Sequence, residues 1–466
     1  MHLSRLIHHF HVKHERHDVE EDTKDEILND DIWTLFKKLA IPSMIGMFMY
    51  SVYLFVDLIF VGQWIGANAL AAVSIVFPLV LVNLVIAAFA GMGFGSLLSR
   101  RLGAGEEDAA KGILTTSTLF VLACSMIYTV LGTIFVDELV AFMGVTGEIH
   151  TLGVSYFKIV ILGAFLFNFV ATATMLVLAE GRPMVTMMIV TIGSLMNIVL
   201  DVVFIWVLGW GVEGAAIATV MSMGIAASAT LAYYLSGRSE LSFDREGLRT
   251  GPQLLREIYP VGSSGAAVNV LALVEQVLIF KSVGIYGTDN DFALIGATLN
   301  MLAFAAVPLS GIGQGLQPLV GMNWGAKRFD RVKEGYFKFL LASTVIAGVI
   351  WALFMLFPEA VLSLYVDDPE LSSAGATMFR IVMGVFILRG FIILPPVLFQ
   401  AIGKGRTAFL LLMSDSVLLF APVIIAFPYF LGIDGVWLAM LCADILIIVM
   451  GLYHVAKEFK VGGKSK

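Results

Sequence analysis

Residues 112–136 read GILTTSTLFVLACSMIYTVLGTIFV and contain no Asp, Glu, Lys or Arg. A helix of this length can cross the hydrocarbon core of a bilayer, which is about 30 Å thick. Residues 159–179, 214–237 and 339–358 are uncharged runs of the same kind. Within a membrane such runs must be helices or closed barrels, because only these satisfy their own backbone polar groups. The alternating pattern of a membrane barrel is absent. The sequence therefore predicts an all-α polytopic membrane protein.

The composition of the whole chain supports this fold class. Of its 466 residues 59% are hydrophobic and only 14% are charged, and the mean hydropathy is +0.90. A soluble domain requires more polar surface than this. Cys124 and Cys442 both lie in apolar runs, so we interpret them as small core residues that form no disulfide framework.

The first 31 residues differ from the rest of the chain. They are polar and charged, and they have neither the apolar core nor the cleavage site of a signal peptide. Residues 1–31 are therefore predicted to be a disordered cytoplasmic tail. Metal binding is the alternative, but no fixed ligand spacing or companion cysteine supports it. Six of the eight histidines lie in this segment: His2, His8, His9, His11, His14 and His17.

Twelve membrane spans are predicted from the apolar runs and the charged or turn-forming segments between them. They lie near residues 41–62, 69–98, 112–136, 153–179, 184–207, 213–236, 258–283, 292–320, 336–357, 377–402, 407–430 and 435–456.

The loops between these spans alternate in charge along the chain. Basic loops collect on the cytoplasmic side of a membrane, which predicts that both termini are cytoplasmic and that the protein lies in a prokaryotic inner membrane. The basic set is Lys37, Lys38, Arg100, Arg101, Arg182, Arg238, Arg245, Arg249, Arg256, Lys327, Arg328, Arg331, Lys333, Lys404, Arg406 and the tail 457–466. The acidic set is Asp137, Glu138, Glu148, Asp289, Asp291, Glu359, Asp367, Asp368 and Glu370.

An internal repeat divides the chain into two halves. GMGFG at residues 91–95 corresponds to GIGQG at 311–315, and GVEG at 211–214 corresponds to GIDG at 432–435. A glycine-rich run can cradle phosphate, but GMGFG lies inside an apolar helix with no preceding strand, so close helix packing is favoured.

Each half holds six spans and begins in the cytoplasm, so the halves are related by a pseudo-two-fold axis along the membrane normal. Transporters commonly place the substrate path between such repeats. The predicted organisation is an N-terminal lobe, a cytoplasmic inter-lobe loop, a C-terminal lobe and a cytoplasmic tail, at residues 32–238, 239–257, 258–456 and 457–466.

Ionisable residues inside the spans are functional candidates, because each costs about 2.5–3.5 kcal/mol on insertion scales. Asp57, Asp201, Glu275, Arg389 and Asp444 lie well inside spans. Asp415 lies nearer the cytoplasmic end of its span. A structural ion pair of Arg389 with either Glu275 or Asp444 is the alternative interpretation for the C-terminal half.

Asp57 and Asp201 have no deep basic partner in the first half. Counting along the helices places both acids, and Thr219, in the outer half of the membrane. Asn197 lies one turn from Asp201, and Tyr53 lies one turn from Asp57. Such an oxygen-rich pocket can take a proton or, through its oxygen atoms, a hard cation such as Na⁺. A purely structural hydrogen-bonded cluster remains the alternative.

The chain resembles the multidrug and toxic compound extrusion (MATE) family, and most resembles its DinF-like prokaryotic branch. The resemblance extends over nearly the whole chain after residue 31. It implies a cation site formed by Asp57, Asn197, Asp201 and Thr219, with Tyr53 beside it and Pro42 as the point where the first helix bends. The segments that carry it are IPSMIG near Pro42, VDLIFVG around Asp57, LGAG at 102–105, AEGRP at 179–183, NIVLD at 197–201 and GVEGAAIAT at 211–219.

NorM-like members of the family have a second cation site in the C-terminal lobe, with an acid on the seventh helix and another on the tenth. Glu275 matches the first of these acids. On the tenth helix Gly390 and Phe391 stand where the acid is expected, next to Arg389. Glu275 and Arg389 are therefore predicted to have a supporting or substrate-facing role.

Together these features predict a secondary active antiporter that exports cationic amphiphilic compounds in exchange for H⁺ or Na⁺ by rocking its two lobes. No ATP-binding motif is present, so the expected energy source is an ion gradient, with no cofactor. The expected partners are organic cations and the lipid bilayer, not nucleic acid, and a duplicated chain is expected to work as a monomer. A lipid-linked saccharide flippase is the alternative within transport. A membrane transferase is disfavoured because no catalytic cluster is found, and the protein is predicted not to be an enzyme.

Overall fold

The computed structural model describes residues 23–365 and 368–462, and within them every regular element is a helix. The six histidines of the N-terminal tail lie outside these residues, as do residues 463–466 of the predicted C-terminal tail. The N-terminal half contains α2 (Ile32–Phe60), α3 (Ala67–Ala104), α4 (Glu107–Ala110), α5 (Ile113–Ile134), α6 (Val136–Phe142), α7 (Gly147–Leu162), α8 (Ala164–Ala179), α9 (Pro183–Asp201) and α10 (Gly211–Leu235). The C-terminal half contains α11 (Glu246–Tyr286), α12 (Asp289–Gly325), α13 (Phe329–Leu356), α14 (Pro358–Leu362), α15 (Pro369–Met383), α16 (Gly390–Ala401), α17 (Gly405–Met413), α18 (Phe420–Leu431) and α19 (Ile433–Gly462).

The predicted spans are confirmed. Within the described residues, eleven helices are long and apolar enough to cross a membrane, and the number rises to twelve when one bent pair is counted as a span. That pair, α7 and α8, meets at 52° around Gly163 and corresponds to the predicted span 153–179. The predicted span 377–402 is divided between α15 and α16, with a 3₁₀ turn (η3, Phe386–Leu388) between them.

Local sequence signals fix several helix ends. The Asp31 carboxylate caps α2 by accepting hydrogen bonds from the backbone N–H groups of Trp33 (2.8 Å) and Thr34 (3.3 Å), which satisfies donors that have no intrahelical partner. Thr288 and Asp291 form a capping box at the start of α12. These polar caps mark the starts of α2 and α12.

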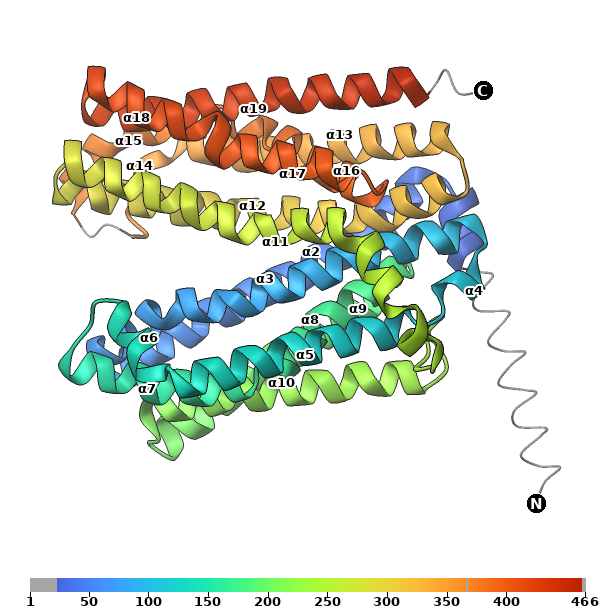
Figure 1. Ribbon diagram of the computed structural model, residues 1–466. Coiled ribbons are helices and arrows are strands. Elements are labelled where there is room, and N and C mark those ends of the chain that lie inside the picture. The colour runs from blue at the N-terminus through green and yellow to red at the C-terminus, as the bar shows by residue number, and fades with distance from the viewer. Residues whose placement is uncertain (1–22, 366–367, 463–466) are drawn as a thin grey trace.

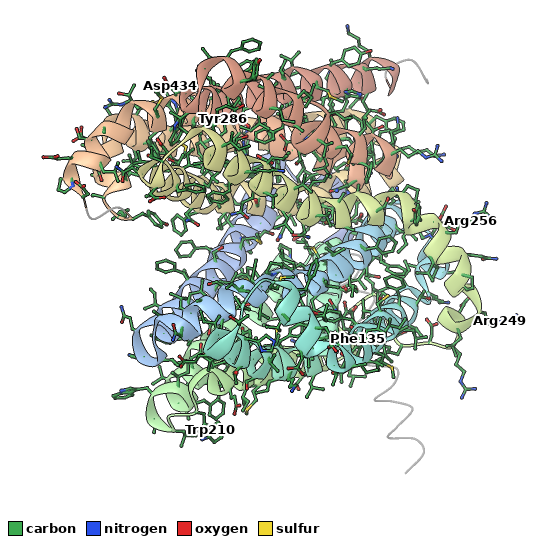
Figure 2. The ribbon with its side chains drawn as sticks, turned by 60° about the vertical axis from the view of Figure 1, so that its left-hand side comes forward. Phe135, Trp210, Arg249, Arg256, Tyr286 and Asp434 are labelled. Carbon is green, nitrogen blue, oxygen red and sulfur yellow. The ribbon has the colours of Figure 1, made fainter. Side chains whose placement is uncertain are left out.

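The helices form two lobes (Figure 1). The N-terminal half, blue to green, and the C-terminal half, yellow to red, meet at the right-hand end of the view, where the described part of the chain also starts and ends. The ribbons of the lobes diverge toward the opposite end. In Figure 2, Phe135 and Trp210 lie in one lobe and Tyr286 and Asp434 in the other. The predicted two-lobe architecture is therefore confirmed.

Glycines bring the lobes into direct contact where they meet. A Cβ atom on Gly315 of α12 would lie 2.7 Å from the Cα of Ala40 in α2, and one on Gly93 of α3 would lie 3.0 Å from Ile258 in α11. Both glycines belong to the repeated runs GMGFG and GIGQG. Their role is close helix packing, as the sequence predicts, because any larger side chain would push the backbones apart.

Two predicted boundaries need correction. Residues 23–29, which lie in the predicted disordered tail, are helical, and Ile27 and Leu28 are buried there. Residues 246–257, which lie in the predicted inter-lobe loop, form the start of α11. Both segments are rich in charged residues, which favours a tail or a loop in the sequence. Apolar residues spaced among the charges nevertheless let each segment pack against the bundle.

Candidate functional site

A cavity of about 570 Å³ lies between the lobes. Its wall is largely apolar and, among the described residues, includes five methionines and one phenylalanine. The methionines are Met47, Met92, Met175, Met187 and Met223. Methionine is flexible and polarisable and adapts to ligands of different shape. The volume is within the range of about 300–1,000 Å³ that is typical of small-molecule sites.

The predicted cation-site residues come together in the N-terminal lobe. Asp57 lies three residues before the end of α2, Asp201 is the last residue of α9, and Thr219 lies in α10. Asn197 and Asp201 are completely buried, and Asp57 is 8% exposed. The carboxyl groups of Asp57 and Asp201 are close enough to interact with each other. Asp57 and Asp201 therefore lie near each other at the ends of α2 and α9.

Several buried polar atoms of this cluster have no hydrogen-bond partner in the described part of the protein. Within the described residues, Oδ1 of Asp57, both carboxylate oxygens of Asp201 and both side-chain polar atoms of Asn197 are buried without a hydrogen bond. Each such atom costs about 1–3 kcal/mol when it stays unsatisfied. A proton shared by the carboxylates, or a cation bound among the oxygens, removes that cost.

The donor set fits a proton or a hard monovalent cation. The described residues contain no group of three or more His, Cys, Asp or Glu side chains that could hold a metal ion. What the cluster offers instead is two carboxylates, the Asn197 amide oxygen and the Thr219 hydroxyl. Oxygen ligands of this kind suit Na⁺, and a buried carboxylate pair suits H⁺.

Tyr156 of α7 belongs to the same cluster, and sequence reasoning missed it. Its side chain interacts with Thr219 and lies within electrostatic range of Asp57 and Asp201. The residue is 7% exposed. The signal available was a single tyrosine near the outer end of the fourth span, which is too common a feature to single out a site.

Helix α2 connects the polar cluster around Asp57 and Asp201 to the cavity. Pro42 and Tyr53 both line the cavity, whereas Asp57, one turn beyond Tyr53, does not. The ring of Tyr53 packs edge-on against that of Tyr50, with 5.2 Å between centroids. Pro42 lies inside the helix, where it removes one backbone hydrogen bond. Asp57 and part of the cavity wall therefore belong to the same helix, and Pro42 weakens the backbone hydrogen bonding of that helix.

A second charged cluster lies in the C-terminal lobe. Nη1 of Arg389 forms an ion pair with Oδ1 of Asp444 at 2.9 Å, so of the two pairings considered, the structure has Arg389 with Asp444. Glu275 accepts a hydrogen bond from Ser416 at 3.5 Å instead. Asp415 completes the cluster from a π-helical turn (η4, Ser414–Leu418). Of these charged residues, Arg389 and Asp415 line the cavity, whereas Glu275 and Asp444 do not.

Two segments of the chain, residues 42–203 and 266–425, match the MatE family model and together make up more than half of the sequence. The chain belongs to the MatE family. The two matched segments correspond to the two halves of the internal repeat. Family membership confirms the resemblance to multidrug and toxic compound extrusion proteins.

Relatives and solved structures in the family cover nearly the whole chain. The multidrug export protein MepA of Staphylococcus haemolyticus (strain JCSC1435) is 23% identical over 438 residues, which cover 93% of this MatE chain and 96% of MepA. MepA of Staphylococcus aureus (strain NCTC 8325 / PS 47) is 24% identical with the same coverage.

A crystal structure of MATE in complex with MaD3S is 25% identical with a TM-score of 0.88, covering 94% of this chain and 99% of that one. An outward-facing multidrug resistance MATE family transporter of the MOP superfamily is 24% identical with a TM-score of 0.89, covering 94% and 98%. The fold of this MatE chain is therefore that of the solved MATE structures along nearly its whole length.

Proposed function

We propose that this MatE protein is a secondary active multidrug exporter that exchanges cationic amphiphilic compounds for H⁺ or Na⁺, with no cofactor. The observation that carries the proposal is the methionine-rich cavity of about 570 Å³ between the lobes. An adaptable apolar wall accommodates varied organic compounds. The name of the MepA relatives, multidrug export protein, supports the same function.

Coupling is proposed to run through α2. A proton or Na⁺ binds at Asp57, Asn197, Asp201 and Thr219, and this changes the position of α2 around Pro42. Tyr53 carries that change to the cavity wall, which weakens the hold on the compound. Coupling requires that the ion bind the two lobe arrangements with different affinity. One charge moving down 100 mV supplies about 2.3 kcal/mol, enough for more than a tenfold gradient of the compound.

The proposed orientation has both termini in the cytoplasm of a prokaryote and the protein in its inner membrane. The basic side chains of Arg249 and Arg256 project outward from the start of α11 (Figure 2). Basic loops favour the cytoplasmic side. The lobes then meet at the cytoplasmic end and diverge toward the outside. Since both lobes that enclose the cavity belong to one chain, the monomer is proposed to be the functional unit.

The charged residues of the cavity wall argue against the alternative function, that of a lipid-linked saccharide flippase. Such a carrier needs several basic groups to hold a pyrophosphate. Among the cavity-lining residues within the described ranges, Arg389 is the one basic side chain, and it is already paired with Asp444.

Efflux of ethidium from proteoliposomes tests the proposal. A proton gradient and a Na⁺ gradient are imposed separately on vesicles that contain the wild-type protein or Asp57→Asn. We expect efflux that follows one gradient and is lost in the variant. Wild-type protein that ignores both gradients would overturn the antiport proposal. Full coupling in Asp57→Asn would leave transport intact and overturn the assignment of the cation site.

A further inference from the structure

We propose that Asp415 binds the positive charge of the exported compound in the central cavity. The inference rests on the proposed export function and adds the residue that recognises charge. The ligand class is a lipophilic organic monocation, such as a quaternary ammonium or phenanthridinium ion.

The cavity wall contains one carboxylate within the described residues. Asp57, Asp201, Glu275 and Asp444 are all absent from the lining, and only Asp415 is present. The cation cluster of the N-terminal lobe therefore offers no acid to a compound in the cavity. Recognition of positive charge there depends on Asp415.

The Asp415 carboxylate is available for a ligand. It makes no hydrogen bond or ion-pair contact of 4 Å or less with any side chain in the described ranges, whereas the nearby Arg389 is held by Asp444 at 2.9 Å. The cluster of Glu275, Asp415, Asp444 and Arg389 contains three acids and one base, so it has an excess of acid. Attraction of a cation is therefore not cancelled by Arg389.

The backbone around Asp415 departs from regular α-helix. Residues Ser414–Leu418 form a π-helical turn between α17 and α18, and the Ser414 hydroxyl donates to the backbone carbonyl of Leu410 at 2.8 Å. π-Helical turns are rare and frequently occur at functional sites. This turn shifts the register of the helix at the point where Asp415 reaches the cavity.

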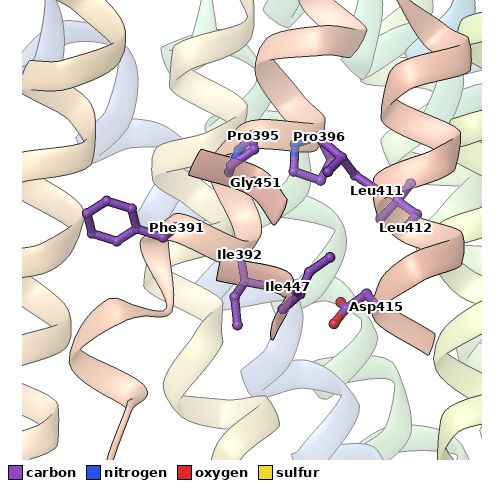
Figure 3. Close-up of a pocket in the computed structure, with 9 residues that line it drawn as sticks. All are labelled: Phe391, Ile392, Pro395, Pro396, Leu411, Leu412, Asp415, Ile447 and Gly451. Carbon is purple, nitrogen blue, oxygen red and sulfur yellow. The ribbon is translucent and has the colours of Figure 1, made fainter. Parts of the chain in front are cut away.

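On one side, the Asp415 carboxylate is lined by apolar residues. Figure 3 shows its carboxylate pointing toward Ile392 and Ile447, in a small pocket whose other lining residues carry no charge. An ionic attraction is stronger in such a low-dielectric setting than in water. The aromatic ring of Tyr50 and the methionines of the main cavity supply apolar and polarisable contacts for the body of the cation.

Equilibrium binding of a matched pair of ligands tests the assignment. The pair is ethidium and the uncharged phenanthridine that lacks its N-ethyl group, measured by fluorescence on the purified full-length protein at a pH where the second compound is neutral. We expect Asp415→Asn to weaken ethidium binding at least tenfold and to leave the neutral compound unchanged. Asp415→Glu, which keeps the charge, is expected to restore ethidium binding.

Asp434→Asn is the matched control, because it makes the same change at an exposed residue at the start of α19 and is expected to alter neither affinity. Equal losses for both ligands in Asp415→Asn would indicate a structural role and overturn the inference. Unchanged ethidium binding in Asp415→Asn would also overturn the inference. In that case, ethidium efflux by the wild-type protein would still support the export function. Wild-type protein that neither binds nor exports ethidium would overturn both.

Discussion

Ile27 lies directly against Gly181, so that a Cβ atom on Gly181 would come within 2.3 Å of the Ile27 side chain. Gly181 belongs to the loop between α8 and α9 of the N-terminal lobe. The same short segment is bound by the C-terminal lobe, because Arg328 donates to the carbonyl of Leu28 at 2.6 Å and Arg331 donates to that of Asp30 at 2.7 Å. Residues 23–31 therefore bridge the two lobes at the end where they meet.

Ile27→Ala is predicted to lower the stability of this lobe arrangement. Ile27 is 2% exposed, and removal of a buried isoleucine side chain costs about 2–5 kcal/mol. Thermal unfolding of the purified protein measures the effect as a lower Tm. Ile285→Ala is the control, because Ile285 is 65% exposed and its loss leaves no cavity. Equal Tm values for Ile27→Ala and wild type would show that the bridge contributes nothing.

Glu180, just beyond the end of α8, predicts a pH-dependent contribution to stability. Its carboxylate accepts hydrogen bonds from Tyr233, at 3.0 Å, and from Ser239. Burial nevertheless raises the pKa of Glu180 from 4.5 to about 7. A raised carboxyl pKa means that the folded state holds its proton more tightly than the unfolded state. The contribution of Glu180 to the free energy of unfolding is therefore fully present below pH 4.5 and falls as pH rises toward 7. Above pH 7 it does not change further.

The test is thermal unfolding of the wild type and Glu180→Gln from pH 5 to pH 8. The amide stays neutral throughout, so the Tm difference between the two proteins should change across this range and level off above about pH 7. All other titrating groups are shared and cancel in the difference. A constant difference at every pH would contradict the prediction.

The fold could be predicted from the sequence because only a few kinds of backbone structure can span a bilayer. Long uncharged runs such as 112–136 must be helices, and the repeated glycine runs required close packing that Gly93 and Gly315 confirm. The bends could not be predicted, since the 52° break around Gly163 depends on tertiary packing. The helix at residues 23–29 was missed because its binding groups, Arg328 and Arg331, lie some 300 positions away in the chain.

The candidate cluster of the N-terminal lobe could be proposed from the sequence because Asp57, Asn197 and Asp201 are unusual residues for a span. Position along the helices placed them at one level of the membrane, and the structure brings Asp57 and Asp201 into interaction. Position along the helices does not show which acid lines the cavity. Glu275 and Asp415 are both acids inside spans, and three-dimensional packing places Asp415, but not Glu275, in the cavity wall.

Gly315→Ala is predicted to disrupt the contact between the lobes. The new methyl group would lie 2.7 Å from the Cα of Ala40, and overpacking of this kind costs about 1–3 kcal/mol. We expect a lower Tm and reduced ethidium efflux. Gly296→Ala in the same helix is the control, since nothing lies within 4 Å of its Cβ position and alanine favours a helix. Equal behaviour of the two variants would argue against direct contact of α2 and α12.

Asp201→Asn is predicted to separate coupling from drug binding. Asp201 is completely buried and does not line the cavity, so the variant should bind ethidium within about threefold of the wild-type affinity, less than 1 kcal/mol by the usual relation. Efflux driven by the coupling-ion gradient should be lost, because a neutral amide neither takes up a proton nor offers Na⁺ a negative charge. Ion binding then no longer changes the affinity for the compound. Fluorescence binding and gradient-driven efflux from proteoliposomes, measured on one preparation, give both quantities. Loss of binding together with efflux would mean that Asp201 stabilises the cavity itself, and retention of both would remove Asp201 from the coupling site.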